Sequence, residues 1–427
     1  MLQAISPSSG ISKTIIVPGD KSISHRAVML CSLADGISTI EGISSGRDCL
    51  ATIGIMRKMG IRIDAEGGKA TIYGKGLYGL RKPGETLNAE NSGTTMRLLS
   101  GLLAWQPFDS VIIGDDSLSK RPMFRIIEPL CRMGASINSV NGCSPLEISG
   151  RSLAGIEYKM PVASAQVKSA ILLAGLAASG KTVIHETHKS RTHTEIMLKH
   201  LGTDISVSGN TITLYPCGRL APNSITVPGD FSSAAFFIVA ALIVPNSQIM
   251  IRNVGINKER TGLLDALCLM GAKIKVSEKS KGKCFKSEPV ADIEVSSSHL
   301  TAVSINKSII VRMIDEVPIF AVAAAFAKGD SVVKDAVELK VKESNRIQTM
   351  AAGLSKIGAD ITETHDGFII KGSDGTRVNG GIVDSHGDHR VAMSLAVAGL
   401  MSNEGVAVQG AECVDVSYPG FFEELPL

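Results

Sequence analysis

The sequence predicts an α/β protein built from repeated units in two similar lobes, and three observations lead to this prediction. First, an apolar helix end followed by Gly and an alternating stretch occurs five times. Second, another apolar segment and a short strand-like piece precede these phrases. Third, Val-Pro-Gly-Asp occurs at 17–20 and again at 227–230, near the middle of the 427 residues. Such a long period is typical of an array of supersecondary units.

The recurring phrase predicts a helix that ends at Gly and is followed by a hairpin. Its glycines are Gly60, Gly134, Gly202, Gly271 and Gly358. Apolar residues before each Gly have helical spacing, and those after it alternate up to a turn signal. Gly is favoured just after a helix because the backbone turns left-handed there.

Each unit gains a second helix from the apolar segment upstream of the phrase. These segments are 27–33, 96–104, 170–178, 234–244 and 319–327. The resulting unit is helix, strand, helix, strand, strand, with another strand leading in. Residues 383–399 begin a sixth unit, which the C-terminus leaves incomplete unless the N-terminal residues complete it.

The two Val-Pro-Gly-Asp segments have two interpretations. Pro-Gly-Asp favours a turn in many contexts, so the repetition could be a recurrent turn. A strand before and an apolar helix after each segment instead favour paired crossovers between two equivalent lobes. We therefore expect crossovers.

Composition and charge limit the classes of function. With 44% apolar and 20% charged residues, the chain is neither disordered nor of low complexity. Only 4% aromatic residues and a net charge of +3 argue against nucleic-acid binding. The first ten residues lack a signal-peptide pattern, and the longest apolar run, 234–244, is too short to span a bilayer. The eight Cys contain no CxxC pair, so we expect reduced thiols and a cytoplasmic protein with no membrane partner.

Two glycine patterns match nucleotide-binding motifs in the wrong context. Residues 175–182 match GxxxxGK[ST], but a phosphate loop follows a strand and opens a helix. Here a helix precedes the motif and a strand follows it, so we expect a helix end capped by Gly180 and no nucleotide kinase. Gly74, Gly76 and Gly79 spell GxGxxG, yet the next segment cannot open the helix that dinucleotide binding needs.

Histidines gather in two places without a metal-site pattern. His185, His188, His193 and His200 crowd one region, and His386 and His389 form HxxH. A metal site needs converging carboxylates or thiolates on a helical face. The polar run 185–193 lacks a regular period, so we expect a solvated loop there and no metal site.

Polar and charged residues interrupt the apolar pattern at the starts of the predicted helices. They lie in PGDKSISHR (18–26), NSGTTMR (91–97), SLSKRPM (117–123), SAQVK (164–168), DEVP (315–318), VKESNR (341–346) and GDHR (387–390). Any one of these alone fits a helix cap or a solvated helix start. Together, the equivalent ends of stacked units would converge on one cleft.

Such a cleft would be strongly cationic. Its expected cations are Lys21, Arg26, Arg121, Lys342, Arg346 and Arg390, with only Asp315 and Glu343 as carboxylates. Arg forks match phosphate and carboxylate geometry, so the cleft suits substrates with several negative charges.

These motifs, in this order, resemble the 5-enolpyruvylshikimate-3-phosphate (EPSP) synthase family over essentially the whole chain. SAQVKSAILLAG (164–175) and GDHRVAMSLAVAGL (387–400) extend the match. The resemblance implies the two-domain enolpyruvyl transferase fold, with six βαβαββ units, three per domain, and the active site in the interdomain cleft. It makes the Val-Pro-Gly-Asp segments crossovers between a first lobe, 1–20 plus 228–427, and a second lobe, 21–227.

The resemblance also implies a reaction. The enolpyruvyl group of phosphoenolpyruvate moves to the 5-hydroxyl of shikimate 3-phosphate and phosphate leaves, in the shikimate pathway to chorismate and the aromatic amino acids. Carried over by motif, shikimate 3-phosphate would contact Lys21, Ser22, Arg26, Ser164, Ala165, Gln166, Arg191, Asp315 and Lys342. Phosphoenolpyruvate would contact Lys21, Gly93, Arg121, Gln166, Arg346 and Arg390.

This chemistry needs an acid and a base on opposite sides of the substrates. We expect Glu343 to protonate C3 of phosphoenolpyruvate, Asp315 to accept the 5-hydroxyl proton, and Lys21 to stabilise the transition state. An exchange of roles between Lys21 and Asp315 stays open. No metal or organic cofactor is expected, because phosphoenolpyruvate is already activated, and the chain is expected to act as a monomer.

Two departures from the family pattern leave glyphosate sensitivity open. Many relatives carry Lys shortly before an aromatic-Pro pair near the C-terminus, where this chain has Val416. Leu98 stands where several relatives have Pro. Together with SRTHTE at 190–195, these changes resemble the divergent bacterial branch of the family.

Two other functions compete with this one. The sister enzyme that transfers enolpyruvyl to UDP-N-acetylglucosamine has a Lys-Asn pair where Lys21-Ser22 stands, and a loop Cys as acid. Residues 115–123 contain no Cys, which argues against it. A non-catalytic anion-binding module would not need Asp315, Glu343 and Lys21 together.

Overall fold

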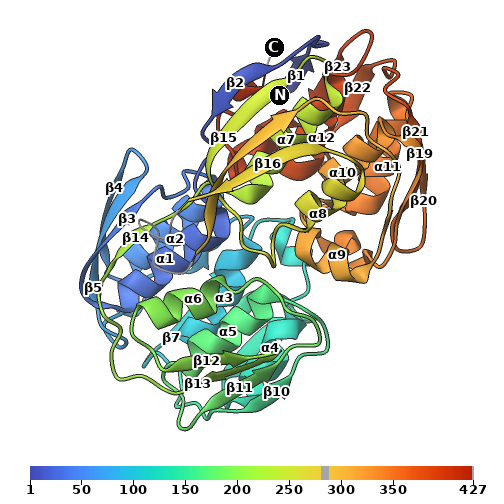
Figure 1. The fold of residues 1–427 in the computed structure, drawn as a ribbon. Coiled ribbons are helices and arrows are strands. Elements are labelled where there is room, and N and C mark those ends of the chain that lie inside the picture. The colour runs from blue at the N-terminus through green and yellow to red at the C-terminus, as the bar shows by residue number, and fades with distance from the viewer. Residues whose placement is uncertain (280–287, 426–427) are drawn as a thin grey trace. The chain divides into compact units, whose positions relative to one another are not determined.

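The computed structural model describes residues 1–279 and 288–425 (Figure 1). Contacts divide these residues into two compact units. Unit 1 consists of Met1–Pro18, 228–279 and 289–425, and unit 2 of Gly19–Val227 together with Glu288. The chain passes from one unit to the other within each Val-Pro-Gly-Asp segment.

Unit 2 contains one arrangement of helices and strands three times. The first repeat comprises β14 (Ser224–Thr226), α1 (Lys21–Leu33), β3 (Asp35–Glu41), α2 (Arg47–Lys58), β4 (Arg62–Glu66) and β5 (Lys69–Lys75). The second comprises β6 (Leu87–Asn88), α3 (Gly93–Leu103), β7 (Asp109–Ile113), η1 (Leu118–Lys120), α4 (Phe124–Arg132), β8 (Ser136–Val140) and β9 (Cys143–Ser149). The third comprises β10 (Glu157–Lys159), α5 (Ala165–Gly175), β11 (Thr182–His185), α6 (His193–His200), β12 (Ile205–Ser208) and β13 (Thr211–Leu214).

Unit 1 also contains three repeats. The first comprises β2 (Ser12–Ile15), α7 (Phe231–Ile243), β15 (Gln248–Gly255), α8 (Gly262–Leu269), β16 (Lys273–Glu278) and β17 (Val290–Ser296). The second comprises β18 (Ser304–Ile305), α9 (Lys307–Met313), α10 (Val317–Ala325), β19 (Lys328–Val333), η2 (Val337–Val341), α11 (Arg346–Lys356), β20 (Asp360–Glu363) and β21 (Phe368–Ser373). The third comprises β22 (Gly381–Asp384), α12 (His389–Gly399), β23 (Val406–Gln409), η3 (Ala411–Val416), α13 (Phe421–Glu424) and β1 (Leu2–Ile5).

The sheets confirm a repeated α/β unit. In β14-β3-β5-β4, the strand β14 runs parallel to β3, and β5 pairs antiparallel with both β3 and β4. The sheets β6-β7-β9-β8, β10-β11-β13-β12, β16-β17-β15-β2 and β18-β19-β21-β20 combine parallel and antiparallel pairs in the same way. In the sheets that contain β6-β7, β10-β11 and β18-β19, a helical segment between the two parallel strands makes the crossover that such a pair needs.

The N-terminal residues complete the sixth unit, as one of the two sequence alternatives predicted. Strand β1 pairs antiparallel with β23, with Leu2 opposite Gln409 and Ile5 opposite Val406. Figure 1 shows blue β1 alongside red β23. This last sheet has three strands, in the order β1-β23-β22.

The Val-Pro-Gly-Asp segments are crossovers and not merely recurrent turns. Strand β2 precedes the first segment and pairs in parallel with β15 of unit 1, although the chain continues into α1 of unit 2. Strand β14 precedes the second segment and pairs in parallel with β3 of unit 2, although the chain continues into α7 of unit 1. Strand β2 of unit 1 therefore leads into α1 of unit 2, and strand β14 of unit 2 leads into α7 of unit 1.

The five glycines of the recurring phrase all end helices, as predicted. Gly60, Gly134, Gly202, Gly271 and Gly358 have φ values of +86°, +101°, +90°, +85° and +100°. This left-handed region strains any residue with a Cβ atom, so Gly lets the chain leave each helix and enter the hairpin without that cost.

The core of each unit contains one apolar helix from each of its repeats. In unit 1, α7, α10 and α12 contact one another, and every residue of α7 is buried. In unit 2, α3 packs against α5, and α1 contacts α3. Within the described ranges, no helix combines the length and apolar character needed to cross a bilayer.

Close packing of α3 against α5 makes Gly101 a sensitive position. A Cβ atom there would lie 2.1 Å from the backbone oxygen of Ala170, whereas a Cβ atom on Gly54 in α2 would meet nothing within 4 Å. We expect Gly101→Ala to lower the free energy of unfolding by roughly 1–3 kcal/mol or more. The matched Gly54→Ala should raise it by about 0.5–1 kcal/mol through helix propensity. Urea unfolding would test both; equal shifts would contradict this account of the packing.

Candidate active site

The residues predicted to bind substrates are divided between the two units, and those of unit 1 form one cluster. Unit 2 holds Lys21, Ser22, Arg26, Gly93, Arg121, Ser164, Ala165, Gln166 and Arg191. Unit 1 holds Asp315, Lys342, Glu343, Arg346 and Arg390. Most of these residues lie at or next to the first turn of a helix, where backbone N–H groups and the helix dipole favour anions.

Three helix starts of unit 2 have side-chain caps. The caps are Asp20, Ser92 and Ser164, which accept hydrogen bonds from the N–H groups of Ile23, Thr95 and Val167 at 2.9, 3.1 and 3.4 Å. Asp20 is the cap of α1, and Ser22 lies in the first turn of that helix. These caps hold the first residues of α1, α3 and α5 in place.

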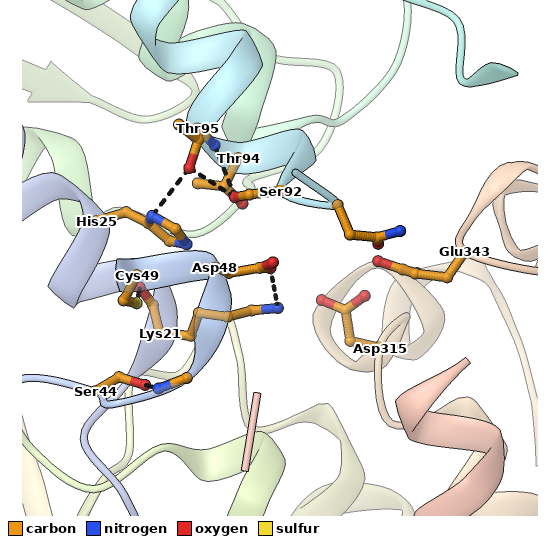
Figure 2. A network of polar contacts seen from close by, with 12 residues as sticks. Lys21, His25, Ser44, Asp48, Cys49, Ser92, Thr94, Thr95, Asp315 and Glu343 are labelled. Carbon is orange, nitrogen blue, oxygen red and sulfur yellow. Dashed lines mark hydrogen bonds and ion pairs between the residues drawn. The ribbon is translucent and has the colours of Figure 1, made fainter. Parts of the chain in front are cut away.

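Lys21 forms an ion pair that the sequence did not indicate. Its Nζ lies 3.0 Å from Oδ2 of Asp48, in the first turn of α2, and Figure 2 shows the contact. The two side chains are only 15% and 8% exposed. The carboxylate of Asp48 favours the charged ammonium and fixes its position. Asp48 was missed because no local pattern links it to Lys21, 27 residues earlier.

His25 joins three helices through a chain of hydroxyl groups. Its Nδ1 lies 2.7 Å from Oγ1 of Thr52, which lies 2.7 Å from Oγ1 of Thr95. Thr95 in turn donates to Oγ of Ser92, the cap of α3 (Figure 2). Burial, with the charges of Lys21 and Arg26, holds the pKa of His25 well below its usual value of 6.5. The neutral imidazole therefore orders these helix starts without adding charge.

The guanidinium group of Arg26 donates hydrogen bonds to other residues of unit 2. Its Nε donates to Oγ1 of Thr194 and its Nη2 to Oγ of Ser169, both at 2.7 Å. Its Nη1 donates to the carbonyl of Ser22 at 2.9 Å. The side chain is buried, so it connects α1 to α5 and α6.

Gly93 admits two guanidinium groups close to the start of α3. A Cβ atom there would lie 2.9 Å from Nη1 of Arg97 and 3.5 Å from Nη1 of Arg121. Arg97 donates to Oε1 of Gln166 at 2.6 Å, and Arg121 donates to Oδ1 of Asn91 at 2.6 Å. Arg97 had no predicted role, although it is the single charged residue of α3.

Arg346 is the centre of the unit 1 cluster. It is the first residue of α11 and is fully buried. Its Nε and Nη2 donate to the two oxygens of Asp388 at 2.7 and 3.2 Å, and Nη2 also donates to Oε2 of Glu343 at 2.5 Å. Oδ1 of Asp315 lies 3.6 Å from Nη1 of Arg346 and accepts from Nζ of Lys342 at 3.2 Å.

The central pair of this cluster is ionised. Burial alone would lower the pKa of Arg346, but Asp388 and Glu343 raise it above its usual value. Burial opposes ionisation of Asp388 as well, yet the charge and hydrogen bonds of Arg346 hold its pKa below the usual value of 3.8. Asp388 also caps α12 by accepting from the N–H of Arg390 at 2.9 Å.

Arg390 lies in the first turn of α12, next to the loop before α10. Its Nη1 donates to the backbone oxygen of Asp315 at 3.1 Å and lies 3.7 Å from Oε1 of Glu316. Glu316, which is buried, accepts a hydrogen bond from Ser232. Thus Arg390 helps to hold the segment that carries Asp315.

The two nucleotide-like motifs have the structures that the sequence predicted, with one correction. Helix α5 ends at Gly175 and β11 begins at Thr182, so 175–182 does not open a helix. Gly180 lies in the turn with φ +84° and does not cap α5, which ended five residues earlier. The segment after Gly79 is likewise irregular up to β6.

The prediction of a solvated loop at 185–193 is partly wrong. Glu186, Ser190 and His193 are buried, because they pack toward Lys168 and Glu288. Among residues 1–279 and 288–425, no three His, Cys, Asp or Glu side chains are arranged to hold a metal ion. The cysteines of these ranges form no disulfide, and Cys284 lies outside the described residues.

Six repeated α/β units with cations at their helix starts define a protein suited to small, multiply charged anions. Comparisons with known proteins agree. A family model described as EPSP synthase (3-phosphoshikimate 1-carboxyvinyltransferase) matches residues 5–425. The chain therefore belongs to the EPSP synthase family, and its fold is the two-domain enolpyruvyl transferase fold.

Individual relatives carry the same name. One from Thermoanaerobacter sp. (strain X514), named 3-phosphoshikimate 1-carboxyvinyltransferase, is 50% identical over 410 residues, 96% of either chain. Another of that name, from Bacillus cytotoxicus, is 50% identical over 418 residues, 97% of either chain. A solved structure of EPSP synthase from Acinetobacter baumannii has a TM-score of 0.87 and 44% identity, and the match covers 99% of this chain and 97% of that one.

Asp388→Asn tests the charge balance around Arg346, because Asn still caps a helix but carries no charge. Folding lowers the pKa of Asp388, so its stabilising effect is complete above the unfolded pKa of about 4 and is lost as pH falls below it. We expect the variant to lose about 3–5 kcal/mol of unfolding free energy at neutral pH and less in acid. Urea unfolding over a pH series would measure this.

Asp64→Asn is the matched control. Asp64 pairs with Arg62 on the surface, where an ion pair contributes little. Its substitution should change the unfolding free energy only slightly at every pH. A loss for Asp388→Asn that stays constant from neutral to acid pH would contradict the proposed ionisation.

Proposed function

We propose that this protein transfers the enolpyruvyl group of phosphoenolpyruvate to the 5-hydroxyl of shikimate 3-phosphate and releases phosphate. The observation that carries the proposal is the match, over nearly the whole chain, to enzymes named for this reaction. The clustered cations support it, because both substrates are anions. We further propose a cytoplasmic monomer whose domains are 1–20 plus 228–427 and 21–227.

Groups from both units would act on the same two substrates. For shikimate 3-phosphate we propose Lys21, Ser22, Arg26, Ser164, Ala165, Gln166, Arg191, Asp315 and Lys342. For phosphoenolpyruvate we propose Lys21, Gly93, Arg121, Gln166, Arg346 and Arg390, and the observed contacts of Arg97 with Gln166 add Arg97 as a neighbour of that site.

The ion pairs favour one division of the proton-transfer roles. Asp48 lies beside Lys21 and favours its ammonium form, which can stabilise developing negative charge but cannot accept a proton. Lys342 lies beside Asp315 and favours its carboxylate form, which can accept the 5-hydroxyl proton. We therefore propose Asp315 as the base and Lys21 as the stabilising cation.

Glu343 would donate the proton that C3 of phosphoenolpyruvate gains. Its carboxylate contacts Arg346, a group that we also assign to phosphoenolpyruvate. An arriving anion would compete with Glu343 for this guanidinium, and its negative charge would favour the protonated carboxyl. Substrate binding would thus prepare the acid, which afterwards takes the proton back as phosphate leaves.

Phosphate release tests the reaction directly. We expect release that requires both phosphoenolpyruvate and shikimate 3-phosphate, because the 5-hydroxyl is the nucleophile. UDP-N-acetylglucosamine, offered as the acceptor in a parallel assay, should give no release. Binding of shikimate 3-phosphate without release of phosphate would favour a non-catalytic module and overturn the proposal.

Glu343→Gln tests the acid. Gln keeps the size of the side chain and can still accept from Arg346, but it has no carboxyl proton to give. We expect kcat to fall by about 10²–10⁴-fold at saturating substrates, with smaller changes in either KM. Glu363→Gln, at an exposed position of strand β20, is the control and should be neutral. Near-normal turnover by Glu343→Gln would refute the assignment.

A further inference from the structure

A buried charge cluster in unit 2 has no part in the chemistry described above. Lys168 in α5 is completely buried, and its Nζ lies 3.1 Å from Oε2 of Glu186 and 2.6 Å from Oε1 of Glu195. Both carboxylates are also buried. Burying one ammonium and two carboxylates is a poor way to gain stability, because their desolvation offsets their attraction. The cluster is therefore better explained by the positions that it fixes than by the stability that it adds.

The two carboxylates make different contacts. Glu186 accepts hydrogen bonds on both oxygens: Oε2 from Nζ of Lys168, and Oε1 from the N–H of Ser190 at 3.0 Å and from its hydroxyl. Lys168 also donates to the carbonyl of Ser190 at 3.3 Å. Within the described part of the chain, neither oxygen of Glu195 has a hydrogen-bond partner of good geometry. Glu195 balances charge, whereas Glu186 also fixes a backbone segment.

The fixed segment lies between two parts of the proposed acceptor site. Ser190 directly precedes Arg191, which is partly exposed just before α6. Lys168 belongs to α5, whose start carries Ser164, Ala165 and Gln166. The chain of contacts from Lys168 through Glu186 to Ser190 therefore ties the segment of Arg191 to the start of α5.

We propose that Glu186 is a positioning residue. It holds Arg191 at the distance from the start of α5 that binding of the 3-phosphate of shikimate 3-phosphate requires. The inference rests on the proposed function, because it takes Arg191 as a contact of that phosphate. Glu186 acts through Arg191, whereas Glu195, which contacts the same ammonium group of Lys168, does not.

The comparison of Glu186→Gln with Glu195→Gln in the full chain tests this inference. Each variant removes one negative charge beside Lys168, and Glu186→Gln also loses hydrogen bonds from buried donors, so both should lose stability in urea unfolding and Glu186→Gln should lose more. In Glu186→Gln an amide group cannot accept from both Lys168 and Ser190, so the segment loosens. We expect its KM for shikimate 3-phosphate to rise by about tenfold, the size of one weakened charge-assisted contact. Its kcat and its KM for phosphoenolpyruvate should change little, and Glu195→Gln should keep all three parameters.

Coupling to Arg191 separates positioning from a general loss of structure. Arg191→Ala should raise the KM for shikimate 3-phosphate, and adding Glu186→Gln to it should raise that KM little further, because both changes remove one interaction. Inhibition by shikimate, which lacks the phosphate, should be the same for Glu186→Gln and the parent protein. If Glu186→Gln does not fold, Ser190→Ala removes only the hydroxyl contact and should raise the same KM by about twofold.

The outcomes distinguish failure of the proposed function from failure of the positioning role. A parent protein that releases no phosphate would overturn the proposed function. Activity with an unchanged KM in Arg191→Ala would overturn the phosphate contact and, with it, this inference. If Arg191→Ala raises the KM for shikimate 3-phosphate, either of two results would overturn the positioning role alone. One is an equal KM in Glu186→Gln and Glu195→Gln. The other is full additivity of the effects of Arg191→Ala and Glu186→Gln.

Discussion

The structure depends on pairing buried positive charge at the starts of apolar helices. A guanidinium or ammonium removed from water is destabilising unless oxygens surround it. The helix bodies are apolar, so these oxygens must come from neighbouring segments. Arg346 takes them from Asp388, at the cap of α12, and Arg26 takes them from hydroxyls of α5 and α6. Each pairing therefore stabilises a buried charge and fixes the relative position of neighbouring helices.

Buried arginines in the two units have different partners, although Lys21 and Lys168 of unit 2 pair with carboxylates as well. Around Arg346 in unit 1 the partners are carboxylates, including Glu343 and Asp315, which can also carry protons. In unit 2, Arg26 and Arg97 use hydroxyl, carbonyl and amide oxygens in the contacts described above, and the neutral His25 adds no charge.

The sequence predicted local structural features better than it predicted which distant residues form ion pairs. The helix ends at Gly60 and its four equivalents follow from neighbouring residues, because a left-handed turn and the flanking periodicity are both local. The pairing of Lys21 with Asp48 and of Arg346 with Asp388 spans 27 and 42 residues, so no local pattern could select those partners. The polar run 185–193 looked solvated for the same reason, since Lys168 supplies its buried counter-charge from another helix.

The central claim is that a side chain of the protein adds a proton to C3 of phosphoenolpyruvate and removes it again. Turnover in D₂O with shikimate 3-phosphate, stopped before completion, would test it by mass spectrometry of recovered phosphoenolpyruvate and product. The account predicts deuterium on the C3 methylene of the product for the parent protein, because a transient methyl group loses either isotope. A product that forms at the normal rate with no deuterium at C3 would contradict it.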